Sequence, residues 1–64
     1  MSIDQSLIAE AESLADGSDI HDVTALVGMY RKLEDHELAP VFERELRQFV
    51  ARKRLERLPQ AAAH

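Results

Sequence analysis

The chain contains no cysteine and no tryptophan, and it has only two glycines and two prolines in 64 residues. Without cysteine it can form neither a disulfide framework nor a zinc site built on thiolates. With so few glycines and prolines it lacks the turn residues that a chain of short strands needs. No unbroken apolar run exceeds three residues, so we expect neither a membrane-spanning helix nor the apolar core of a signal peptide.

Helix-forming residues are abundant. Nine alanines and eight leucines accompany many Glu, Arg, Lys and Gln residues, whereas the β-branched residues are few and do not alternate. The length leaves no room for a cofactor-binding α/β fold. We therefore predict an all-α protein, a small antiparallel three-helix bundle with a single domain over residues 1–58 and a flexible tail over residues 59–64.

Apolar residues recur at helical spacing over residues 3–16, 19–35 and 38–58, and each range is predicted to be a helix. The core face expected for the first helix is Ile3, Leu7, Ile8, Ala11, Leu14 and Ala15. For the second helix it is Val23, Leu26, Val27, Tyr30 and Leu33. For the third helix it is Val41, Phe42, Leu46, Phe49 and Val50, extended by Leu55 and Leu58.

Capping and breaking residues mark the helix ends. Ser2 and Gln5 have the spacing of a capping box at the start of the first helix, and Gly17 is predicted to end it in a left-handed conformation. Gly28 lies within the second helix, either tolerated there or marking a close helix approach. Pro40 suits a first helical turn, but the sequence leaves open whether the second and third helices are separate or form one helix kinked there.

The small number of aromatic residues predicts a thin core, because the chain has only two phenylalanines and one tyrosine. A chain of this size buries a modest share of its surface and is marginally stable alone. We therefore expect a homodimer, either compact or intertwined, with the third helix as its seam.

Charge is distributed unevenly along the chain. Residues 1–30 contain six acids and no Lys or Arg, whereas residues 31–64 contain eight bases and six acids. Six of these bases fall between positions 44 and 57: Arg44, Arg47, Arg52, Lys53, Arg54 and Arg57. They could pair with the acidic first helix or form a solvated face, they could dock a protein, or they could contact nucleic acid. The interspersed glutamates and a pI of about 5.2 disfavour nucleic acid.

The sequence contains few residues that could form a catalytic or metal-binding site. Its three histidines, His21, His36 and His64, have no cysteine nearby and no Glu-x-x-His pattern, and His36 is expected in an exposed loop. We expect no catalytic, cofactor-binding or metal-binding residue, no small-molecule substrate, and no carboxylate with a perturbed pKa. The glutamates of the third helix also argue against membrane-surface binding.

Residues 33–39, Leu-Glu-Asp-His-Glu-Leu-Ala, resemble a helix-start segment of the small enterobacterial modulators of haemolysin expression, the Hha/YmoA family. The resemblance covers these seven residues, and the pattern departs from that family after Ala39. It implies an all-helical protein that acts by binding a partner, and it assigns no role to any residue.

The function predicted from these features is that of a non-enzymatic small regulatory or adaptor protein, such as a cytoplasmic bacterial or phage modulator, that binds another protein through helical surfaces. The alternative is a nucleic-acid-binding transcriptional regulator that uses the basic third helix of a dimer. The partner-binding residues expected from the sequence are the six bases together with Tyr30 and Phe49 as aromatic anchors. Core packing is the competing interpretation for both aromatic residues.

Overall fold

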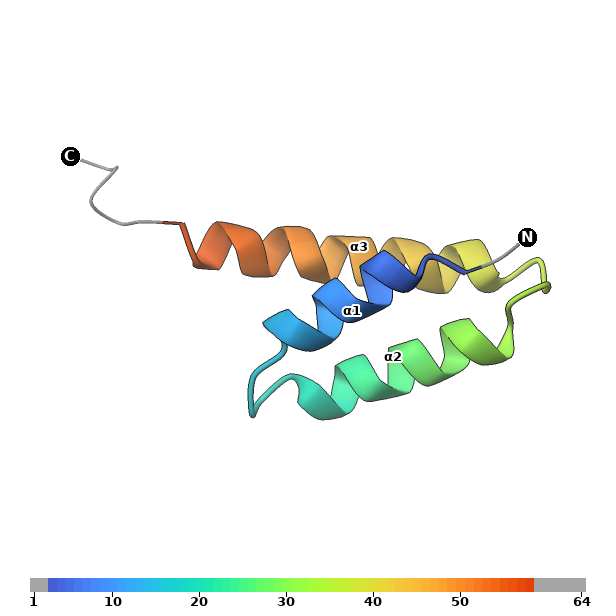
Figure 1. The fold of residues 1–64 in the computed structure, drawn as a ribbon, viewed down its shortest axis with the longest axis horizontal. Helices are drawn as coiled ribbons and strands as arrows, with labels where there is room; N and C mark the ends of the chain where they lie inside the picture. Colours follow the sequence, from blue (N-terminus) through green and yellow to red (C-terminus); the bar gives the residue numbers. More distant parts are fainter. Residues whose placement is uncertain (1–2, 59–64) are drawn as a thin grey trace.

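The computed structural model describes residues 3–58, which form three helices. They are α1 (Gln5–Leu14), α2 (Ile20–Lys32) and α3 (Ala39–Glu56). Each helix runs antiparallel to the preceding one, and α3 lies along both others (Figure 1). The predicted all-α antiparallel bundle is confirmed, and α2 and α3 are separate helices joined by residues 33–38. The predicted flexible tail, residues 59–64, lies outside the described range.

Both predicted ends of α1 need correction. The helix begins at Gln5 behind Asp4, whose carboxylate accepts a hydrogen bond from the Leu7 amide at 3.1 Å. Ser2, expected to cap this helix, lies outside the described residues. Gly17 does not adopt a left-handed conformation, since no glycine in the described part of the chain has a positive φ. The chain leaves the helix earlier, because Ala15 is already extended at φ −69° and ψ 139°.

Pro40 and Gly28 are the two remaining residues that the sequence marks as helix-breaking. Pro40 lies in the first turn of α3, as predicted. Gly28 is exposed on α2, and a Cβ added there would meet no atom within 4 Å. It is therefore a tolerated glycine rather than a point of close helix approach.

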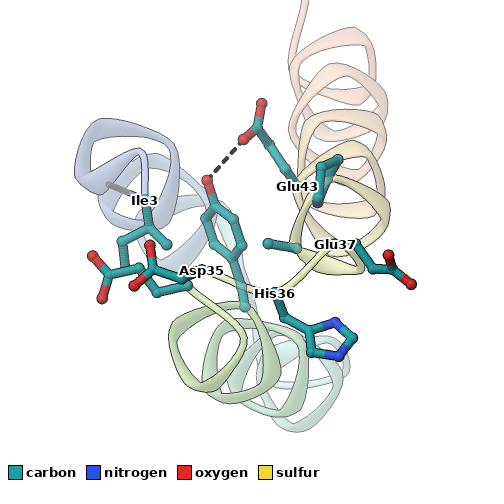
Figure 2. Close-up of a pocket in the computed structure, with 9 residues that line it drawn as sticks. Ile3, Asp35, His36, Glu37 and Glu43 are labelled. Carbon is teal, nitrogen blue, oxygen red and sulfur yellow. Dashed lines mark hydrogen bonds between the residues drawn. The ribbon is translucent and has the colours of Figure 1, made fainter. Parts of the chain in front are cut away.

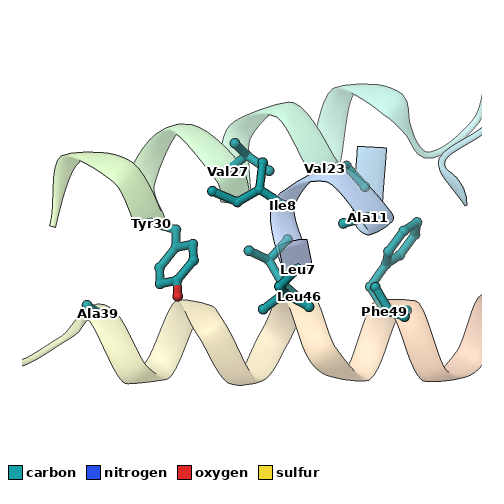
Figure 3. Packing of buried hydrophobic residues seen from close by; sticks show 10 residues of the cluster. Leu7, Ile8, Ala11, Val23, Val27, Tyr30, Ala39, Leu46 and Phe49 are labelled. Atoms are coloured by element: carbon teal, nitrogen blue, oxygen red, sulfur yellow. The ribbon is translucent and has the colours of Figure 1, made fainter. Parts of the chain in front are cut away.

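The core lies where the three helices meet, and Tyr30 extends across it from α2 to α3 (Figure 3). The predicted faces of α1 and α2 are confirmed, because all their members are buried in the core or packed against it. The apolar members of the core are Leu7, Ile8, Ala11, Val23, Val27, Tyr30, Ala39, Leu46, Phe49 and Val50.

The predicted core face of α3 is wrong at three positions. Val41, Leu55 and Leu58 are 52%, 68% and 57% exposed, although we expected them in the core. Leu46 is completely buried, and Leu55 lies nine residues later, about two and a half turns, which puts it on the opposite side of the helix. The core stripe continues through Lys53 instead, about two turns after Leu46.

Candidate interaction surface

The six bases of α3 and its C-terminal end do not form one surface. Successive residues of a helix are rotated by about 100°, so the consecutive bases Arg52, Lys53 and Arg54 point in three directions. Lys53 is buried, whereas Arg52 and Arg54 are exposed. The basic run seen in the sequence is therefore divided between the inside, the flanks and the outer side of the helix.

Lys53 binds the turn between α1 and α2. Lys53 is only 7% exposed, and its Nζ donates a hydrogen bond to Asp16 Oδ2 at 3.1 Å. It also forms ion pairs with Asp19 and, at 3.6 Å, with Glu56. We expected Lys53 on the exposed basic surface, and this expectation is wrong. Its aliphatic stem continues the apolar stripe of α3 while its ammonium group reaches the acids at the edge of the core.

This ion cluster shifts the pKa values of two of its members, Lys53 and Asp16. Hydrogen bonds to Asp19 and Asp16 raise the pKa of Lys53. The pKa of Asp16 is well below its ordinary value, chiefly because the Ser18 hydroxyl (2.7 Å) and amide (2.9 Å) donate to its carboxylate, and secondarily because Lys53 does. We expected no carboxylate with a perturbed pKa, and this expectation is wrong at Asp16.

Arg47 belongs to a second polar cluster at the other end of the bundle. Its guanidinium donates twice to Glu43 Oε2, at 3.1 and 2.8 Å, and lies 3.5 Å from Asp4. The Tyr30 hydroxyl donates to Glu43 at 2.9 Å and accepts from the Asp4 amide at 3.0 Å. The Arg47 hydrogen bonds, followed by that of Tyr30, lower the pKa of Glu43, whereas burial raises the pKa of Tyr30. This network joins α1, α2 and α3.

Two further arginines are directed at α1. Arg54 forms an ion pair with Glu10. Arg57 donates from Nη2 to the Leu14 carbonyl at 3.0 Å, and so satisfies one of the carbonyls that the end of a helix leaves unpaired. The interpretation that these bases pair with the acidic first helix is confirmed in part. Arg54 pairs with Glu10 of α1 and Arg47 with Asp4 at its N-cap, whereas Lys53 pairs with acids in the turn after α1.

Arg44 and Arg52 differ from the other four bases. Both are exposed, and neither forms a hydrogen bond or ion pair with any of residues 3–58. They lie on the side of α3 that faces away from α1 and α2, which we call the outer face. The outer face consists of Val41, Arg44, Glu45, Gln48, Arg52 and Leu55, all of them exposed.

Neither proposed aromatic anchor lies on that face. Tyr30 is 1% exposed and Phe49 is 6% exposed, and both belong to the core. The Lys53 ammonium group lies 5.9 Å from the centre of the Phe49 ring, within cation–π range. Core packing, the competing interpretation of both residues, therefore accounts for their positions.

A hollow of about 230 Å³ opens where the α2–α3 connection meets the start of α1 (Figure 2). Its lining residues are Ile3, Tyr30, residues 34–37, Ala39, Pro40 and Glu43. The Glu43 carboxylate is occupied by Tyr30 and Arg47. His36 and Glu37 point away from Ile3 (Figure 2), and His36 Nδ1 accepts a hydrogen bond from the Leu38 amide at 3.1 Å. His36 is exposed in the connection, as predicted.

Among residues 3–58, no three His, Asp or Glu side chains converge as ligands for a metal ion. Within the same range, no helix combines the length and the apolar character that crossing a membrane requires.

Comparison with known proteins yields no relative. No protein-family model, no curated protein and no solved structure matches the chain. Residues 33–38 form the connection before α3 rather than a helix start, and the resemblance to the haemolysin modulators gains no support from these comparisons.

Proposed function

We propose that this chain is a non-enzymatic interaction protein that binds another polypeptide through the outer face of α3. The observation that carries the proposal is the composition of that face. Exposed apolar side chains stand near both ends of the helix, and Arg44, Glu45 and Arg52 between them have no charged partner among residues 3–58. Exposed apolar groups combined with unpaired arginines are typical of protein interfaces.

Nucleic acid is a weaker candidate for the same face. Four of the six bases between positions 44 and 57 are held by groups of the chain itself, namely Arg47, Lys53, Arg54 and Arg57. Of these six bases, only Arg44 and Arg52 would be available to a phosphate backbone, with Glu45 between them in the sequence. The net charge of −4 also opposes the approach of a polyanion, and the aromatic side chains Tyr30, Phe42 and Phe49 all pack in or against the core, away from stacking bases.

The proposal includes the role of a small regulator or adaptor, of the kind found as cytoplasmic modulators in bacteria and phages. A rigid helix supported by two others presents its outer face at little entropic cost, which favours binding without further folding.

Site-specific photo-crosslinking in expressing cells tests the proposal. A photoreactive residue at Gln48, in the middle of the outer face, should give a discrete protein adduct that can be identified by mass spectrometry. The matched control carries the same residue at Ala25, an exposed position on α2, and should give none. Protein adducts from neither position, or equally from both, would contradict the proposal.

The nucleic-acid alternative needs its own measurement. Fluorescence anisotropy with a short mixed-sequence duplex, at low and moderate salt, should show no specific binding by the full chain. Binding that weakens steeply with salt, and that is lost in the double variant Arg44→Glu with Arg52→Glu, would replace the first proposal with the alternative.

A further inference from the structure

The exposed apolar side chains of the outer face are arranged symmetrically. Val41 stands near the start of α3 and Leu55 near its end, 52% and 68% exposed. Each is seven positions from Gln48. A second α3 running in the opposite direction, with a two-fold axis near Gln48, would therefore match apolar end to apolar end.

We infer that the outer face of α3 binds a second copy of this chain in antiparallel orientation. The inference rests on the proposed function, because it names the partner of the same face. A two-fold interface requires a surface that is complementary to itself. The spacing of the apolar residues meets this requirement, and the charges decide between the two possible orientations.

Charge complementarity favours the antiparallel arrangement. Glu45 is three positions before Gln48 and Arg52 is four positions after it, so antiparallel pairing brings Glu45 of one copy beside Arg52 of the other, twice by symmetry. A parallel pair would instead place Glu45 beside Glu45 and Arg52 beside Arg52. Both residues are exposed and have no charged partner within residues 3–58, so pairing between copies breaks no existing contact.

The remaining bases near this seam do not oppose the pairing strongly. Arg47 and Arg54 lie on the flank next to α1, where Glu43, Asp4 and Glu10 already neutralise them. Arg44 lies on the outer face itself, and its aliphatic stem can cover Leu55 of the second copy while its guanidinium stays in water.

The length of α3 limits the area that such a pair can bury. Eighteen residues of α3 give a helix about 27 Å long. One helix pair of that length reaches at most the lower end of the roughly 1,200–2,000 Å² that stable interfaces bury. The dimer should therefore be reversible, with a dissociation constant on the order of micromolar.

Sedimentation equilibrium of the full chain over a wide concentration range tests the inference through a charge-swap series. The single variants Glu45→Arg and Arg52→Glu should each weaken the dimer about tenfold, because each turns two attractions into repulsions. The double variant Glu45→Arg with Arg52→Glu restores opposite charges across the antiparallel seam, and its affinity should return to within about threefold of the original.

Matched controls change the same charges elsewhere. Glu12→Arg on α1 and Arg31→Glu on α2 alter exposed residues outside the outer face and should leave the dimer unchanged. Circular dichroism of every variant checks that the helices are retained.

Three results would overturn the inference: a monomer at all concentrations, single variants as tight as the original chain, or a double variant that stays weak. The second would indicate parallel pairing or a different seam. A monomer that still gives a Gln48 crosslink to another protein would remove the second copy as partner and leave the proposed function intact. Loss of that crosslink to every protein would remove both.

Discussion

The two sides of α3 carry the same kinds of residue in opposite circumstances. On the side facing α1 and α2, Leu46 is fully buried and Lys53 is held by two aspartates. On the outer face, Leu55 is 68% exposed and Arg52 has no charged partner in residues 3–58. Residue type therefore does not determine the role of a position here. The side of the helix does, and it separates residues that stabilise the fold from residues available for binding.

The largest expected effect is on the free energy of unfolding, and it distinguishes Leu46 from Leu55. Leu46→Ala should lower the free energy of unfolding by about 3 kcal/mol, a large share of the roughly 5–15 kcal/mol available to a domain. Leu55→Ala should change it by about 0.5 kcal/mol or less. Urea unfolding followed by circular dichroism, in samples dilute enough to be monomeric, measures both. Equal losses would mean that the two sides of α3 contribute alike to the fold.

The second comparison concerns the bases. Lys53→Met keeps the length of the buried stem but leaves Asp16 and Asp19 without their cation, and the melting temperature should fall by a few degrees. Arg52→Met removes an exposed charge that contacts no described acid, so it should melt as the original chain does. Thermal unfolding of the two variants side by side is the measurement. A Lys53→Met protein as stable as the Arg52→Met protein would show that the ion pairs of Lys53 do not stabilise the fold.

The smallest expected effect is on the pH dependence of stability, and it concerns Asp16, a partner of Lys53. The pKa of Asp16 is lower in the folded chain than its ordinary value of 3.8, so the folded state binds its proton less readily than the unfolded state does. Its stabilising contribution is therefore complete above about pH 4 and is lost as the pH falls toward the folded pKa. Thermal unfolding between pH 2 and 6 should show a shallower loss of stability for Asp16→Asn than for the original chain. Asp22→Asn, which changes an exposed aspartate of α2, is the control variant.

Most of the fold was predictable from local patterns. The faces of α1 and α2 follow from apolar spacing alone, because burial of one stripe of an amphipathic helix depends on periodicity within that helix. Pro40 likewise marks the first turn of α3 through its missing amide hydrogen. The start of α1 was misplaced because Ser2 and Asp4 are both good capping residues, and local propensity does not choose between them.

The position of Lys53 was missed for a different reason. Arg52, Lys53 and Arg54 are consecutive in the sequence, but neighbouring residues of a helix are rotated by about 100° and so do not share a face. The signal was present, because Lys53 follows Leu46, Phe49 and Val50 at the spacing of a core face. Its acidic partners could not be inferred in the same way. Asp16 and Asp19 lie more than thirty positions earlier in the chain, and only the packing of the helices brings them to Lys53.

That separation has a kinetic consequence. Asp16 and Lys53 are 37 residues apart, so their contact closes a long loop and requires α3 to be docked on the α1–α2 pair beforehand. Contacts that form after the rate-limiting step of folding leave the folding rate nearly unchanged and slow unfolding instead. We infer that this contact forms late in folding, and that Lys53 therefore affects the unfolding rate more than the folding rate.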